Sequence, residues 1–219
     1  MVKPHSSTKR SKLPASGPAA DLETRERILD AAHAVFLRKG TANSRTQEIA
    51  DEAGVNKALV HYYFGTKAAL ADAIFERATG TLLPRIFGLL ADPARAIPVK
   101  VREIVREQID FHSARPYLAG YVVSEMHAEP ERVGRLFARQ GGAPLDVLRR
   151  QLREAAKAGT MRPISAEQFV VNLMALLVFP FAIRPALGAL LALEPSRWTA
   201  FLEERRRILP DFFLAGLRP

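Results

Sequence analysis

Residues 44–67 read SRTQEIADEAGVNKALVHYYFGTK, and this stretch decides the fold of the N-terminal part of the chain. Ser44, with Gln47 three residues later, predicts a capping box at the start of one helix. Gly54 stands where a left-handed residue closes that helix, and Asn56 is a favoured N-cap for the next one. This spacing is typical of a helix-turn-helix motif, whose second helix enters the major groove of DNA.

Apolar residues inside the motif occupy the positions that two crossing helices need. Ile49 and Ala50 are expected to face inward, and the small side chain of Ala50 allows a close crossing. Val55 and Val60 hold the two positions of a hydrophobic staple at the start of the second helix. An αα-hairpin that packs without binding anything fits the same pattern, so the motif alone leaves that alternative open.

Polar residues around the second helix favour DNA binding over an inert hairpin. The side chains expected on its outer face can reach bases and phosphates, and they are Asn56, Lys57, His61 and Tyr62. Lys67 lies in the first turn of the following helix, which Thr66 caps. A cation at that end opposes the helix dipole, so a phosphate that completes the site would explain it.

Residues from about Thr24 to Leu70 resemble the N-terminal domain of the TetR family of bacterial transcriptional regulators. The matching segments are ERILDAAHAVFLRKG (26–40) and SRTQEIADEAGVNKALVHYYFGTKAAL (44–70). The rest of the chain matches only in length and helical character. The resemblance implies a transcriptional repressor that binds a palindromic operator in double-stranded DNA as a homodimer. A small molecule in the C-terminal domain would release it from DNA.

The resemblance also assigns DNA contacts to individual positions. The set is Arg45, Thr46, Asn56, Lys57, Ala58, His61, Tyr62, Tyr63 and Lys67. Asn56, Lys57 and Ala58 are expected to enter the groove first, because the N-terminal residues of a recognition helix approach base edges. Arg45, Tyr62, Tyr63 and Lys67 are expected to contact phosphate.

Three positions depart from the family pattern. Arg45 stands where family members often carry a hydroxyl residue, which adds a charge. His61 replaces a frequent tyrosine and Leu59 a frequent threonine. These departures leave the preferred DNA sequence open.

Helical periodicity continues to the C-terminus, without strand alternation bounded by hairpin signals. We expect an all-α fold in which an N-terminal three-helix bundle with the helix-turn-helix is joined by a connecting helix to a larger α-helical ligand-binding and dimerisation domain. The expected divisions are a disordered basic arm (1–20), a DNA-binding domain with its connecting helix from Lys67 to Gly80 (21–80), and the helical domain (81–219).

Charge supports a polyanionic partner. The 219-residue chain has a formal net charge of +9, and residues 1–70 hold 11 Lys and Arg against 7 Asp and Glu, which is +4. Within the arm, the basic residues Lys3, Lys9, Arg10 and Lys12 are placed to lie along DNA, although a solvated tail fits the same composition.

Composition argues against catalysis and metal binding. The chain has no cysteine, and its five histidines lack metal-ligand spacing. We find no glycine-rich phosphate loop and no pairing of nucleophile with base. We therefore expect no enzyme, no cofactor and no metal. The rival hypothesis is a helical enzyme or small-molecule carrier with an incidental helix-turn-helix.

The most apolar segment is FVVNLMALLVFPFAI, residues 169–183. It is shorter than the roughly 20 residues that a spanning helix needs, and Pro180 and Pro185 are expected to interrupt the helix. We therefore expect no membrane association and a cytoplasmic protein. The segment suits a dimer interface or an ordinary core. The candidate interface residues are Phe169, Leu173, Leu176, Leu177 and Phe201.

The effector cannot be named from the sequence. Middle helices carry aromatic and polar side chains that suit a pocket, although each also fits an ordinary core: Phe111, His112, Tyr117, Tyr121, Met126 and Phe137. The default expectation is a largely apolar or aromatic molecule with one or two polar handles.

Overall fold

The protein is described from a computed structural model that covers residues 18–139 and 141–219, and across these residues the secondary structure is entirely helical. The all-α expectation is confirmed. The helices are α1 (Pro18–Asn43), α2 (Thr46–Ala53), α3 (Lys57–Phe64), α4 (Lys67–Gly80), α5 (Leu82–Ala91), α6 (Ile97–Ser113), α7 (Leu118–Ala128), α8 (Pro130–Arg139), α9 (Asp146–Lys157), α10 (Ala166–Ala182), α11 (Arg184–Leu190) and α12 (Pro195–Ala215).

The expected basic arm falls largely outside the described residues. Residues 18–20, which we had placed in that arm, are helical and open α1. The arm is therefore at least three residues shorter than its composition suggested.

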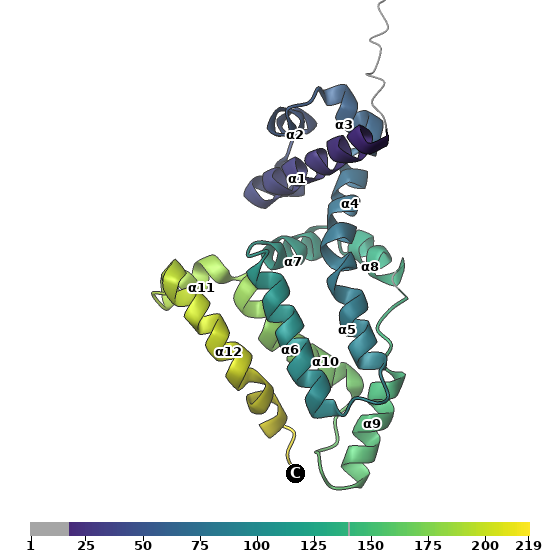
Figure 1. Cartoon of the computed structure of the whole chain (residues 1–219), viewed down its shortest axis with the longest axis vertical. Coiled ribbons are helices and arrows are strands. Elements are labelled where there is room, and N and C mark those ends of the chain that lie inside the picture. Colours follow the sequence, from purple (N-terminus) through teal and green to yellow (C-terminus); the bar gives the residue numbers. More distant parts are fainter. Residues whose placement is uncertain (1–17, 140) are drawn as a thin grey trace, which may run out of the picture.

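Helices α1, α2 and α3 form a head at one end of the molecule, and α4 descends from this head towards α5 (Figure 1). An apolar stripe of α1 is buried, with Ile28, Ala32 and Phe36 at most 1% exposed. Gly40 breaks the helix, because its φ of 74° and ψ of 158° are not helical. One further turn then continues to Asn43.

The turn between α2 and α3 has the predicted backbone. Gly54 closes α2 in the left-handed conformation, with φ 64° and ψ 34°. Asn56 caps α3, since its Oδ1 accepts a hydrogen bond of 2.9 Å from the backbone N–H of Leu59. Val55 and Val60 both pack on the core of the head, as the staple predicted.

The predicted capping box at Ser44 is wrong. The N-cap of α2 is Arg45, and its N–H donates to Glu48 Oε2 over 3.1 Å. Ser44 is buried, and its hydroxyl donates to the carbonyl of Gly40 and does not cap α2. Gln47 instead donates to Asp51, one turn further along.

The body packs α5, α6, α9, α10 and α12 around a second apolar core. Ser165 caps α10 through a hydrogen bond from the Gln168 N–H. Pro180, however, lies inside α10, which continues to Ala182. A proline cannot donate to the carbonyl four residues earlier, and that carbonyl, of Leu176, accepts from Arg205 of α12 over 2.5 Å.

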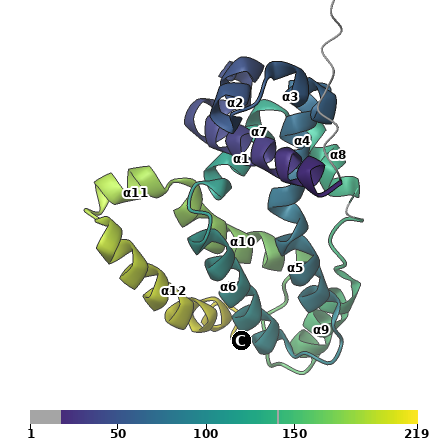
Figure 2. The ribbon, with the colours of Figure 1, turned by 45° about the horizontal axis from the view of Figure 1, so that its top comes forward.

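Helices α7 and α8 lie between head and body (Figures 1 and 2). Tyr121 of α7 belongs to the core of the head, where its ring stacks on Phe36 at 6.4 Å. On α8, Val133 and Leu136 pack against Phe75 of α4. The head therefore shares its packing with the body and does not hang from α4 alone.

Within the described part of the chain, no single helix is both long and apolar enough to cross a membrane. Helices α10 and α11 together have the length and apolar composition of a membrane-spanning segment, but the chain bends by 74° at the break between them.

Candidate nucleic-acid interface

Helix α3 presents its N-terminal end to solvent. Asn56, Lys57 and Ala58 are exposed, as are His61 and Tyr62 one turn further on. The opposite side is fixed by Val60, which is 3% exposed. These are the positions that a recognition helix uses to approach base edges.

The role of Asn56 as the N-cap of α3 limits the base edges to which its side chain can bind. Its Oδ1 is occupied by the Leu59 N–H, and the amide nitrogen keeps its two donors. In the major groove, those donors match acceptors such as N7 and O6 of guanine or O4 of thymine.

The ring of His61 is oriented by the backbone at the C-terminal end of α3. Its Nδ1 lies 2.8 Å from the carbonyl oxygen of Gly65. A carbonyl only accepts, so Nδ1 carries the proton and Nε2 of the neutral ring is left as an acceptor. An acceptor at this position suits the amino groups of cytosine or adenine.

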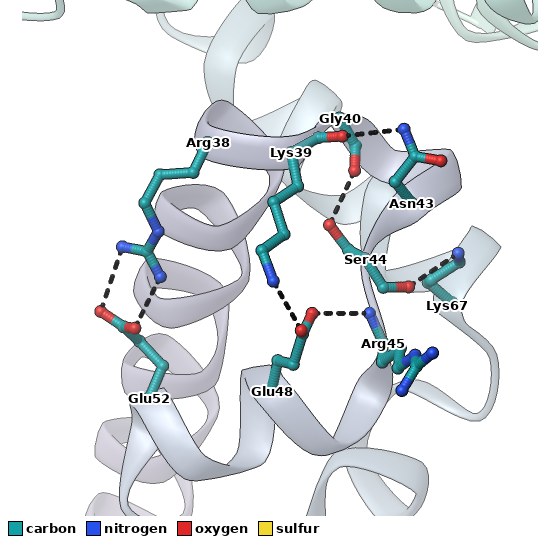
Figure 3. A network of polar contacts seen from close by, with 9 residues as sticks. All are labelled: Arg38, Lys39, Gly40, Asn43, Ser44, Arg45, Glu48, Glu52 and Lys67. Carbon is teal, nitrogen blue, oxygen red and sulfur yellow. Dashed lines mark hydrogen bonds and ion pairs between the residues drawn. The ribbon is translucent and has the colours of Figure 1, made fainter.

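A polar network fixes α2 against the end of α1 (Figure 3). Arg38 pairs with Glu52 at 2.7 Å, and Lys39 pairs with Glu48 at 2.6 Å. The hydrogen bond from Lys39, followed by the one from the Arg45 N–H, lowers the pKa of Glu48 below its ordinary 4.5. Glu48 is thus an anion that ties two helices together.

Lys67 reaches across the same network (Figure 3). Its ammonium donates to the carbonyls of Ala42 and Ser44, at 2.9 and 3.0 Å. Two of its three N–H groups therefore hold the α1–α2 connection, and only the third is left for a phosphate. The expected location at the start of α4 is confirmed, together with its Thr66 cap.

The other expected phosphate contacts differ in availability. Tyr62 is 63% exposed, and Arg45 is exposed beside the half-buried Thr46 in the first turn of α2. Tyr63 is half-buried, and its hydroxyl donates to Asp21 of α1 over 2.9 Å. Its hydroxyl is thus already engaged within the head.

The residues expected to line an effector pocket separate in the structure. Tyr117 and Tyr121 lie on the wall of a cavity of about 210 Å³ where α7 meets α1 and α10. Phe111 lines another cavity of similar volume beside α5. His112 is buried, with its ring 5.0 Å from that of Phe181.

The last two expected pocket residues have other surroundings. Phe137 packs edge-on against Phe75 at 5.4 Å, which makes it part of the α4–α8 contact. Met126 is 42% exposed. The pattern of aromatic residues in the sequence did not separate cavity walls from packing contacts.

The expected dimer residues need a correction. Phe169, Leu173 and Leu177 are at most 2% exposed within one chain, so they have almost no surface to offer a partner. Leu176 and Phe201 are half-buried. The expected residues lie on α10 and α12, and the large apolar side chains that these two helices leave exposed are Val171, Phe179, Ile208 and Phe212.

Tyr117 also lies on the wall of a larger cavity, of about 510 Å³, between head and body, whose other wall residues sequence reasoning missed. Its wall includes His33 of α1, Arg77 of α4 and Arg115 after α6. The signal was absent because these residues come from three distant segments, and each has the charge or polarity of an ordinary surface residue.

The head therefore has the arrangement of a helix-turn-helix DNA-binding protein, with a capped and exposed recognition helix. Residues 28–74 match the family model of the bacterial regulatory proteins, tetR family. The head is therefore similar to the N-terminal part of these regulators, and the relatives that the chain resembles include HTH-type transcriptional repressors.

Two relatives illustrate the range of similarity. The HTH-type transcriptional repressor SCO4008 of Streptomyces coelicolor is 34% identical over 98 residues, which are 43% of this chain and 45% of that repressor. This match spans less than half of the relative's length. The HTH-type transcriptional repressor NicS of Pseudomonas putida is 26% identical over 210 residues, or 89% of this chain and 92% of NicS.

Solved structures share the fold along most of the chain. The TetR family regulator PfmR from Thermus thermophilus has a TM-score of 0.65 at 22% identity, covering 88% of this chain and 100% of PfmR. The transcriptional regulator SCO4942 from Streptomyces coelicolor has a TM-score of 0.62 at 23% identity, covering 90% and 99%. The similarity thus extends beyond the DNA-binding head to the helical body.

Proposed function

We propose that the protein is a repressor that binds a palindromic operator as a homodimer and is released by a small molecule. The observation that carries the proposal is the exposed N-terminus of α3, where Asn56, Lys57 and Ala58 face solvent while α2 is fixed behind them. We propose that these residues read bases, together with His61. Arg45, Thr46 and Tyr62 would contact phosphate.

The proposal keeps Lys67 and Tyr63 near the DNA in changed roles. Lys67 positions the α1–α2 connection and offers one remaining N–H to a phosphate. Tyr63 fixes α3 to α1 through Asp21. The DNA-binding region in this proposal runs from α1 to the end of α4 at Gly80.

The geometry of operator recognition and the exposed apolar surface support the proposed dimer. One recognition helix reads only a few base pairs, whereas two related by a dyad read half-sites about 34–36 Å apart. Val171, Phe179, Ile208 and Phe212 leave apolar surface exposed on α10 and α12. We propose that these two helices meet their copies in the partner chain.

Helices α7 and α8 contact α4, the helix that descends from the head, and a ligand can act through this contact. Arg132 of α8 is mostly buried and donates to Asp72 of α4 at 2.6 Å and to Glu125 of α7. A shift of α7 or α8 therefore moves α4 and the recognition helix with it. Linkage requires that DNA weaken ligand binding by the same factor.

Sequence-specific, salt-sensitive binding to the DNA upstream of the protein's own gene tests the repressor. We expect Lys57→Ala to weaken binding to that DNA, while the same change at Lys157, exposed on α9, leaves binding intact. Equal affinity for upstream and unrelated DNA would contradict the proposal and favour the rival enzyme or carrier.

A further inference from the structure

The cavity of about 510 Å³ between head and body falls within the range of small-molecule sites, about 300–1,000 Å³. Three segments form its wall: α1, α4 and the connection from α6 to α7. Figure 2 shows α1 and α4 close to α7 at this level. A molecule in this cavity would touch both the DNA-binding head and the body.

The wall carries an excess of positive charge. It holds two arginines, Arg77 and Arg115, against the single aspartate Asp30. Arg77 is neutralised, since it pairs with Asp30 at 2.8 Å and with Glu26 at 3.2 Å. Arg115 makes no ion pair within the described residues, so its charge is available to a ligand.

The guanidinium of Arg115 is held in place by stacking. Its Cζ lies 4.5 Å from the centre of the Phe111 ring. The carboxylates of Glu107 and Asp110, which line a neighbouring cavity with Arg115, are engaged by Arg85 and Arg206. A guanidinium stacked on a ring keeps its in-plane N–H groups for a bidentate carboxylate.

The remaining wall is mainly apolar, and it includes one buried polar atom without a hydrogen-bond partner among the described residues. Leu37, Ile74 and Leu118 contribute apolar surface, and Tyr117 adds a ring. Nε2 of His33 is buried and has no hydrogen-bond partner among the described residues. A buried polar atom without a partner is uncommon.

We propose that this cavity binds an amphipathic carboxylate, with the carboxylate on Arg115 and the apolar part between α1, α4 and the α6–α7 connection. Occupancy alters the position of the head on the body, because the ligand contacts both and its fit depends on their separation. This regulatory step rests on the proposed repressor function. The binding site itself does not.

Naphthalene-2-carboxylate and its neutral carboxamide are matched probes that differ mainly in charge. By calorimetry, we expect the wild-type protein to bind the acid about tenfold more tightly than the amide, which corresponds to one charge-assisted hydrogen-bond pair. Arg115→Gln should remove this preference. Arg162→Gln, at an exposed site at the far end of the body, should retain it.

Equal affinities for acid and amide, or no saturable binding up to about 1 mM, would overturn the site. Unchanged binding in Arg115→Gln would overturn it as well. In a second measurement, the acid should weaken binding of wild-type protein to upstream DNA and leave Arg115→Gln unaffected. An unaffected wild-type protein would overturn the regulatory step.

The two proposals fail separately. If the ligand-free protein does not select upstream DNA, the proposed repressor function is contradicted. Binding of the acid that depends on Arg115 would still support the proposed binding site. If the protein binds upstream DNA selectively and the acid has no effect on this binding, the regulatory role of the cavity is contradicted and the proposed repressor function stands.

Discussion

Lys57 is the side chain whose role depends least on its neighbours. It is exposed at the first position of α3, and no hydrogen bond or ion pair engages it within the described residues. We expect Lys57→Ala to cost roughly 1–3 kcal/mol per half-site on the cognate operator if it contacts a base. Fluorescence anisotropy on cognate and unrelated DNA measures this cost. Equal losses on both DNAs would make Lys57 a phosphate contact.

His112 makes the stability of the body depend on pH. Burial, followed by the charge of Arg115, lowers its pKa from 6.5 to about 4. In the unfolded chain, His112 therefore gains a proton as the pH falls through 6.5, whereas in the folded chain it gains this proton only near pH 4. Stability is full above pH 6.5 and falls by up to about 3 kcal/mol as the pH drops through this window.

The His112→Phe variant should flatten this pH dependence, because a phenyl ring fills similar space and has no proton to gain. Urea unfolding followed at several pH values between 4 and 6.5 measures the difference from wild type. The matched change at His127, which is exposed, should leave the slope unaltered. A wild-type slope in His112→Phe would show that other groups control acid stability.

At the scale of elements, Lys67 joins α4 to the connection between α1 and α2. Lys67→Met retains the chain length and loses both carbonyl contacts, so we expect unfolding to become easier by about 1 kcal/mol. Urea denaturation measures this change, and Lys57→Met, at an exposed site, is the control. Unchanged stability with a salt slope of DNA binding reduced by about 1 per contact would assign Lys67 to DNA alone.

At the scale of the whole molecule, the proposed dimer depends on faces that the single chain leaves exposed. Phe179 of α10 is 57% exposed and Phe212 of α12 is 67% exposed. A lysine at both positions should give a folded monomer, because a charge at the centre of an apolar interface is costly and obligate interfaces bury about 2,000 Å² or more.

Sedimentation at micromolar concentration, with circular dichroism to verify folding, measures the outcome. Val123→Lys, at an exposed apolar site on α7, should remain dimeric. The monomeric variant should lose tight operator binding, because one head buries too little for specific recognition. A wild-type monomer of 24.2 kDa that binds a palindrome tightly would contradict the dimer and the role of α10 and α12.

The sequence determined the features that depend on neighbouring residues. Gly54 closes α2 and Asn56 and Ser165 cap α3 and α10, because a cap needs one side chain and a backbone conformation within four residues. The buried stripe of α1 could be predicted for a related reason: its polar and apolar faces differ, which defines its orientation.

Only the tertiary structure decided which face of α10 is buried and where the cavities lie. A helix that is apolar all round has no sequence signal for its orientation, so Leu173 and Phe179 could not be assigned to core and surface. Lys67 likewise owes its role to the α1–α2 connection, which is distant from it in sequence. Arg115 owes its role to the cavity that it lines together with α1 and α4. Such roles follow from packing between helices, which short-range patterns do not encode.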